Sequence, residues 1–129
     1  MTERLPGDVL AMVRDAREVL IETRPAPDVP PHRTVIWVVV DEQDRAFIRT
    51  VRGATSRWYR EALAAGTVGF LVDGQRVEVS VEHVQDEERI EACSQAMRRK
   101  YATSRASLAA MLLPAVLSTT LELHPIANA

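Results

Sequence analysis

Residues 67–84, "TVGFLVDGQRVEVSVEHV", set the fold class of this chain. They contain Asp73-Gly74, a dipeptide typical of the two-residue type I′ turn that joins antiparallel strands. After this turn Val77, Val79 and Val81 alternate with polar residues, as expected of a strand with one face buried and the other in water. The stretch therefore predicts an antiparallel hairpin.

Upstream and downstream segments extend this sheet. Residues 33–41, "RTVIWVVVD", and residues 46–51, "AFIRTV", are rich in β-branched and aromatic residues and flank a polar turn, which predicts a second hairpin. A short β-prone segment, "VLIETR", precedes them, and "TTLELHP" alternates again as a closing strand. Together these segments predict six strands.

Two helices are predicted in the first half of the chain. Residues 8–18, "DVLAMVRDARE", place apolar residues at three- and four-residue spacing, with Asp8 as the capping residue. Residues 55–66, "TSRWYREALAAG", predict a short helix that Thr55 or Ser56 caps and Gly66 terminates.

The second half predicts further helices. Asp86 is placed to cap a helix whose first turn is acidic and whose last turn is basic, which suits the helix dipole at both ends. Residues 104–113 predict another helix that ends before Pro114. Because few strands have room for a parallel crossover between them, we predict a mainly β fold with α: an antiparallel sheet closed into a small barrel with helices at its ends or flank.

Composition limits the kinds of protein that this chain can be. At 129 residues and 47% hydrophobic content, residues 1–129 are expected to form one domain. A formal charge of -2 and a pI near 5.9 argue against a nucleic-acid-coating protein. The most apolar run, "ASLAAMLLPAVL", is shorter than the roughly 20 residues of a membrane span. With one cysteine and no signal-peptide pattern at the N-terminus, the chain is expected in the cytoplasm.

The main candidate site lies in residues 47–66, "FIRTVRGATSRWYREALAAG". Phosphates in proteins are commonly held by arginines, hydroxyls and the free N–H groups of a helix N-terminus, and this stretch offers all three. The candidate phosphate contacts are Thr50, Arg52, Gly53, Ser56 and Arg57. The alternative is that Ser56 only caps a helix, Gly53 only makes a turn and the arginines form a solvated face. The residues alone leave both interpretations open.

Other candidates are weighed in the same way. Arg33, just before the strongest strand, could reach a planar anionic group, or it is a surface arginine. Trp37 and Trp58 could stack on a flat ring, or they make core or dimer contacts. Three histidines far apart in sequence and one cysteine give no metal-ligand spacing, so no metal site is predicted. Cys93 lies on the apolar stripe of a predicted helix and is expected to be buried and inert.

The chain resembles the split-barrel flavoproteins, the superfamily of pyridoxamine-phosphate oxidase and the deazaflavin-dependent nitroreductases. More closely, "IWVVV", "IRTVRG" and "WYREAL" look like a bacterial group within that superfamily known mainly as a domain of unknown function. The resemblance covers most of the chain. It implies a six-stranded antiparallel split barrel with flanking helices and a homodimer with the flavin at the subunit boundary.

The resemblance also implies site residues. Arg33-Thr34-Val35 and Ser56-Arg57 look like the positions that hold FMN in the oxidase branch. Gly53 and "WYREAL", which contains Trp58, look like the phosphate-side motif of the nitroreductase branch. Trp58 stands where the oxidase pattern brings a second cation, and Glu61 stands where the nitroreductase pattern has asparagine.

The residues and the resemblance together lead to three alternative hypotheses for the function. The first is an FMN- or deazaflavin-binding oxidoreductase, in which the cofactor ring does the redox chemistry and no catalytic side chain is named. The second is a non-catalytic binder of a small ligand on the same barrel. The third is a partner-binding dimer whose arginine-rich patch meets an acidic protein surface.

Overall fold

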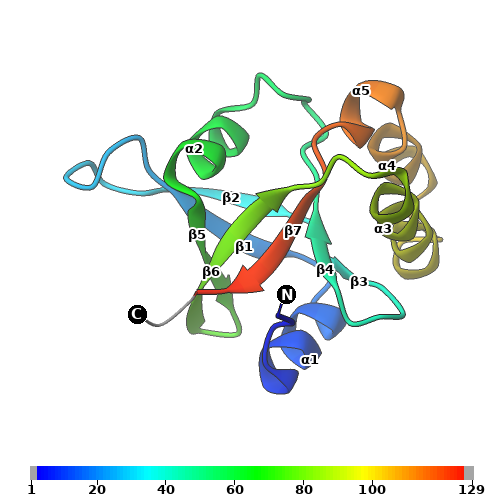
Figure 1. The fold of residues 1–129 in the computed structure, drawn as a ribbon, viewed down its shortest axis with the longest axis horizontal. Helices are drawn as coiled ribbons and strands as arrows, with labels where there is room; N and C mark the ends of the chain where they lie inside the picture. The colour runs from blue at the N-terminus through cyan, green and yellow to red at the C-terminus, as the bar shows by residue number, and fades with distance from the viewer. Residues whose placement is uncertain (1–2, 127–129) are drawn as a thin grey trace.

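The computed structural model describes residues 3–126, which form a curled antiparallel sheet with helices outside it (Figure 1). The helices are α1 (Gly7–Asp15), α2 (Arg57–Ala65), α3 (Glu87–Lys100), α4 (Arg105–Met111) and α5 (Pro114–Leu117). The strands are β1 (Val19–Thr23), β2 (His32–Ile36), β3 (Val39–Val40), β4 (Ala46–Ile48), β5 (Thr67–Val72), β6 (Gln75–His83) and β7 (Leu121–Pro125).

The order of the strands explains why the sheet curls. They run β2-β1-β5-β6-β7-β4-β3, with antiparallel pairing throughout. The two edge strands, β2 and β3, are joined by only Trp37 and Val38. Because so few residues reach roughly 10 Å at full extension, the two edges must come close together. They do so without pairing, and the result is a split barrel.

The predicted fold class is confirmed, but the strand count differs. The expected strand at residues 33–41 divides at Trp37 and Val38 into β2, which pairs with β1, and β3, which pairs with β4. The sheet therefore has seven strands and not six. Both halves of the run are rich in β-branched residues, so local sequence carries no sign of the break, which is seen only in the pairing of the two halves with different strands.

The central hairpin forms as predicted. Asp73 and Gly74 have φ angles of 49° and 79°, the positive values that a type I′ turn requires at both central positions. Val72 pairs with Gln75 across the turn, and the pairing continues to Thr67 and Ser80.

Three of the predicted helix caps are confirmed. Ser56 precedes α2, where its side chain accepts a hydrogen bond from the Tyr59 amide, and Gly66 ends that helix at φ 77°. Asp86 caps α3 through the Arg89 amide.

The predicted start of α1 is wrong. The residue before the helix is Pro6, which makes no side-chain cap, and Asp8 lies inside the first turn. Pro6 has φ -56° and the helix begins directly after it, one residue earlier than expected. The helix ends at Asp15, before residue 18, because the chain extends at Ala16 and then enters β1.

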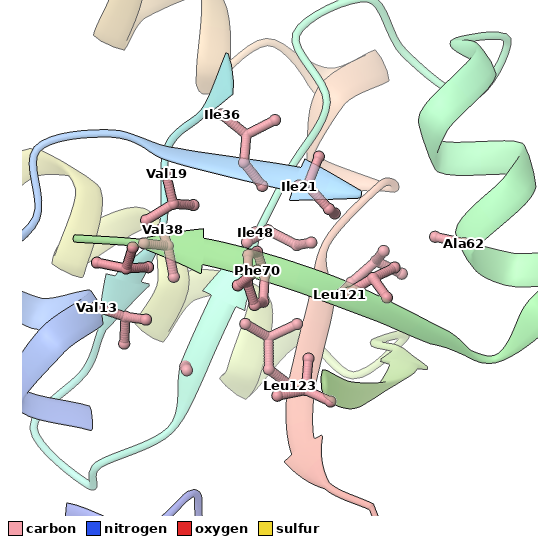
Figure 2. Close-up of a cluster of buried hydrophobic side chains, with 14 of the residues drawn as sticks. Val13, Val19, Ile21, Ile36, Val38, Ile48, Ala62, Phe70, Leu121 and Leu123 are labelled. Carbon is pink, nitrogen blue, oxygen red and sulfur yellow. The ribbon is translucent and has the colours of Figure 1, made fainter. Parts of the chain in front are cut away.

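Two hydrophobic clusters hold these elements together. The first fills the barrel, where side chains from several strands converge with Val13 of α1 and Ala62 of α2 (Figure 2). Ile21, Ile48 and Leu121 are completely buried there, and full burial of such a side chain contributes about 1.5–3 kcal/mol. The second cluster joins β3 and β4 to helices α3, α4 and α5 and contains Cys93, Met97 and Tyr101 among its members.

Cys93 is confirmed as a buried thiol. Its side chain has no exposed surface, and burial raises the pKa of the thiol to about 12. Among residues 3–126, no helix is long and apolar enough to cross a membrane.

Candidate cofactor-binding site

The loop from β4 to α2 is a pair of turns that carries most of the predicted site residues. The Gly53 amide donates to the Thr50 carbonyl at 3.0 Å, and the Ser56 amide donates to the Gly53 carbonyl at 3.1 Å. Gly53 has φ 80°, a conformation that favours glycine. The Thr50 amide donates to the Thr119 hydroxyl at 3.2 Å and so fixes the loop to the segment before β7.

This loop borders a pocket of about 760 Å³, which we call the α2 pocket. Its volume falls within the range of small-molecule sites. The lining residues come from β2 and the residues beside it, from the loop, from the start of α2 and from α4: Glu18, Thr34, Val35, Ile36, Trp37, Arg49, Thr50, Val51, Arg52, Ser56, Arg57, Trp58, Ala106, Ser107, Ala110 and Met111.

Five of the seven predicted site residues line this pocket together: Thr50, Arg52, Ser56, Arg57 and Trp58. The N–H groups of Arg57 and Trp58 open α2 and therefore have no acceptor within the helix. Ser56 thus caps the helix and lines the pocket as well. For Ser56, capping the helix therefore does not exclude a place in the pocket.

Gly53 and Arg33 are not in the lining. A side chain added at Gly53 would meet open space, and the φ angle of 80° at this residue shapes the turn. Arg33 stands opposite Glu22 across β1 and β2, and its Nε donates to Glu22 Oε2 at 2.9 Å. The structure therefore places Arg33 in a cross-strand ion pair outside the pocket.

Arg49 is a lining residue that the site prediction did not include. It has no exposed surface, and burial lowers the pKa of its guanidinium. Its hydrogen bonds go to uncharged acceptors: the Thr120 and Ser94 hydroxyls, the Ile90 and Met111 carbonyls and, at 3.9 Å, the Met97 sulfur. Its place directly after the apolar residues of β4, Ala46–Ile48, is the signal that could have identified it.

The charge of the pocket favours an anion. The lining contains three arginines, Arg49, Arg52 and Arg57, and one carboxylate residue, Glu18. Among residues 3–126, none of these arginines forms an ion pair with a carboxylate. Because a guanidinium binds phosphate or carboxylate oxygens through two parallel hydrogen bonds, the pocket suits a ligand with such a group.

Aromatic rings form part of the wall. Trp37 is stacked on Tyr101, with ring centroids 3.7 Å apart and planes 5° from parallel. Trp58 is buried, with 6% of its surface exposed, and packs edge to face on Tyr59, with ring centroids 6.2 Å apart. Both tryptophans of the chain therefore line the α2 pocket.

Within residues 3–126, one cluster could supply metal ligands, namely Glu82, Glu122 and His124. It lies on β6 and β7, apart from the α2 pocket. Arg89 already donates to both carboxylates at 2.8 Å, so the cluster holds a cation of its own.

Comparison with known proteins identifies the family. Residues 9–123 match DUF2255, described as an uncharacterized protein conserved in bacteria. The chain belongs to the DUF2255 family. No curated protein sequence matches it.

Several solved structures have a fold similar to that of this DUF2255 chain. The conserved hypothetical protein Rv2991 from Mycobacterium tuberculosis is 18% identical with a TM-score of 0.66, covering 99% of this chain and 83% of that one. HutZ, a heme storage protein from Vibrio cholerae, is 11% identical with a TM-score of 0.63, covering 98% and 93%. A proposed pyridoxamine 5′-phosphate oxidase from Listeria innocua is 14% identical with a TM-score of 0.62, covering 93% and 92%. At these identities the similarity shows the fold alone.

Proposed function

We propose that the α2 pocket binds FMN or a deazaflavin and that the protein is an oxidoreductase built around that cofactor. The observation that carries the proposal is the convergence of arginines, hydroxyls, a helix N-terminus and two tryptophans on one cavity. The similarity to the Listeria innocua structure supports it at the level of the fold.

The residues present fit the two ends of such a cofactor. Arg52, Arg57 and Ser56 would hold the phosphate, together with the first N–H groups of α2. Arg52 would supply the second cation that Trp58 displaces from the oxidase pattern. Beyond them lies β2, an edge strand that pairs only with β1, so its outward N–H and C=O groups are available to the polar edge of a ring.

When bound, the flavin supplies the redox chemistry, and the chain supplies position and charge. The buried guanidinium of Arg49 would favour negative charge in the cavity, because no carboxylate among the described residues neutralises it directly. Thr50 would keep the loop in place through Thr119. Arg33 would act from outside the pocket by fixing β2 against β1.

We also propose that a second copy of the chain completes the site. Val35 and Val51 line the pocket, yet they are 56% and 51% exposed. Large apolar side chains at a cavity edge are the kind of surface that a subunit contact buries. A cytoplasmic location belongs to the same proposal, because the single cysteine is a buried thiol.

Binding without turnover is the second candidate function. Among residues 3–126, the lining of the α2 pocket contains one carboxylate, Glu18, and no histidine or cysteine, so this lining offers few groups for proton transfer. HutZ, which has a similar fold, is described as a heme storage protein and not as an enzyme.

Absorbance and tryptophan fluorescence of the purified protein test the proposal. Because both tryptophans line the α2 pocket, a flavin there should quench most of the intrinsic emission, and titrations with FMN and a deazaflavin should saturate. Unchanged emission and no flavin absorbance with either cofactor would overturn the proposal. Anaerobic reduction of the bound flavin by a nicotinamide donor, followed by reoxidation with a substrate, would distinguish an enzyme from a carrier.

A further inference from the structure

A second cavity of about 760 Å³ lies on the other side of α2, and we call it the loop pocket. Its walls are the β1–β2 loop, the exposed side of α2 and parts of β5 and β6. The loop projects on the same side of the molecule as α2 and β5 (Figure 1). Arg57, at the start of α2, lines both this cavity and the α2 pocket.

Three arginines of the loop pocket form no direct ion pair with a carboxylate of the described residues, although the charge of Arg57 acts on Glu61 and helps to lower its pKa. Arg24, Arg57 and Arg60 line the cavity, and within residues 3–126 none of them pairs with an acidic side chain. Arg24 donates only to the Pro27 carbonyl, at 3.2 Å. These guanidinium groups are free to bind a ligand.

Three glutamates line this cavity. Glu78 is half-exposed, and its Oε2 lies 3.9 Å from Arg76 Nη1. The first of the other two, Glu22, is already bound by two cations. Glu22 Oε2 accepts from Arg33 Nε at 2.9 Å, and Glu22 Oε1 accepts from Arg76 Nε at 3.0 Å. The Arg76 guanidinium lies over Gly69, where an added Cβ would come within 2.7 Å of it. Glycine at position 69 therefore makes room for the cation that neutralises Glu22.

The second glutamate is held in the same way. Glu61 Oε1 accepts from the Thr23 hydroxyl at 2.8 Å, and His32 Nδ1 lies 3.2 Å from both carboxylate oxygens. Burial would raise the pKa of Glu61, but the hydrogen bonds from Thr23 and His32 outweigh it and keep the pKa below its ordinary value. Glu61 thus bonds to Thr23 of β1 and His32 of β2, and within residues 3–126 its direct ion pair is with His32. The charge of Arg57 also lowers the pKa of Glu61, without a direct contact.

We propose that the loop pocket is a second binding site, for a small organic oxyanion with a carboxylate or phosphate group. Arg24, Arg57 and Arg60 bind its oxygen atoms, because guanidinium groups without carboxylate partners pair well with such groups. Thr23 and His32 act as positioning residues that hold Glu61 away from the anion. This site does not depend on a flavin in the α2 pocket, although Arg57 makes each site sensitive to the other.

NMR spectroscopy of the isotopically labelled full chain tests this site, with inorganic phosphate and succinate as separate probes. Ionic strength is kept constant, because salt screens exposed charges. We expect saturable shifts of the side-chain Nε–H signals of Arg24, Arg57 and Arg60. Saturation by one probe alone would identify the oxyanion class. Shifts that rise linearly with both probes and never saturate would overturn the proposal.

Matched variants locate the binding. Arg60→Ala should raise the dissociation constant of the saturating probe by about fivefold or more, as expected for loss of a charge-assisted hydrogen bond. Arg99→Ala, an exposed arginine of α3, should leave it unchanged. Equal affinities of these two variants would overturn the proposal. Arg60 does not line the α2 pocket, so FMN should quench the tryptophan fluorescence of Arg60→Ala as it does that of the parent. The anion titration therefore tests the loop pocket, and the FMN titration tests the α2 pocket independently.

Discussion

Trp37 and Tyr101 lie face to face, with ring centroids 3.7 Å apart and planes 5° from parallel. Trp37 lines the α2 pocket, and Tyr101 directly follows α3, so the pair connects a wall of the candidate site to the second hydrophobic cluster. The Tyr101 hydroxyl also donates to the Arg17 carbonyl at 2.8 Å. The Trp37 ring of this wall therefore packs on a residue that does not line the pocket.

Replacing Tyr101 should show what this stack contributes. Tyr101→Ala removes a fully buried ring and should lower the free energy of unfolding by about 3–5 kcal/mol. Tyr101→Phe keeps the ring but loses the hydroxyl bond, and should cost about 1 kcal/mol. Urea unfolding measures both, and equal losses would contradict the importance of the stack.

Arg49 should not be replaceable by lysine. Lysine keeps the charge but cannot reach acceptors in α3, α4 and the segment before β7 at the same time, because its ammonium is compact. Arg49→Lys should lower the free energy of unfolding by about 1–3 kcal/mol. Arg14→Lys, at an exposed pair with Asp44, is the control and should change it by less than about 0.5 kcal/mol. Similar values for the two variants would show that charge alone suffices at position 49.

Acid should destabilise the protein partly through Glu22. Hydrogen bonds from Arg76, and next from Arg33, hold the pKa of Glu22 below its ordinary value of 4.5 despite its burial. The folded state therefore binds fewer protons than the unfolded state in this range. The stability from Glu22 is complete above pH 4.5 and is lost as the pH falls through the folded-state pKa.

Unfolding free energies measured across that acid range check this prediction. Glu22→Gln should be less stable than the parent at neutral pH and should lose less stability on acidification. Parallel curves for the two proteins would show that Glu22 takes no part in the acid response.

The phosphate end of the α2 pocket can be tested with two ligands that differ by one group. Arg52→Ala and Arg57→Ala should each weaken FMN binding about tenfold or more, since a charge-assisted contact contributes about 1.5–3 kcal/mol. Riboflavin, which lacks the phosphate, should bind the variants and the parent alike. Fluorescence titration measures all of these affinities, and an equal loss for riboflavin would assign the arginines to another part of the ligand.

The features that the sequence predicted well are local ones. Asp73-Gly74 fixes its turn through the φ angles of two adjacent residues, and Ser56 caps α2 through an amide three residues away. Signals of this kind are readable without knowledge of the rest of the molecule. The same locality brought five of the predicted site residues to one pocket, because they lie within nine positions of each other in the chain.

The features that the sequence did not predict depend on distant partners. The break at Trp37 and Val38 depends on the pairing of β2 and β3 with different strands, and the partners of Arg33 and Arg49 come from other elements. Glu61 of the loop pocket contacts His32, which lies 29 positions earlier in the chain. Such pairings require the topology of the barrel, which no window of the sequence contains.

The position of β7 in the sheet has a consequence for how the protein is made. The last described strand lies between β6 and β4, and it alone connects β4 and β3 to the rest of the sheet. A chain leaving the ribosome can form the β5–β6 hairpin early, but it cannot join its two half-sheets before residues 121–125 emerge. Thr119 and Thr120, which anchor Thr50 and Arg49, appear at the same stage. Thr50 and Arg49, which line the α2 pocket, therefore gain these contacts only when that segment of the chain is present.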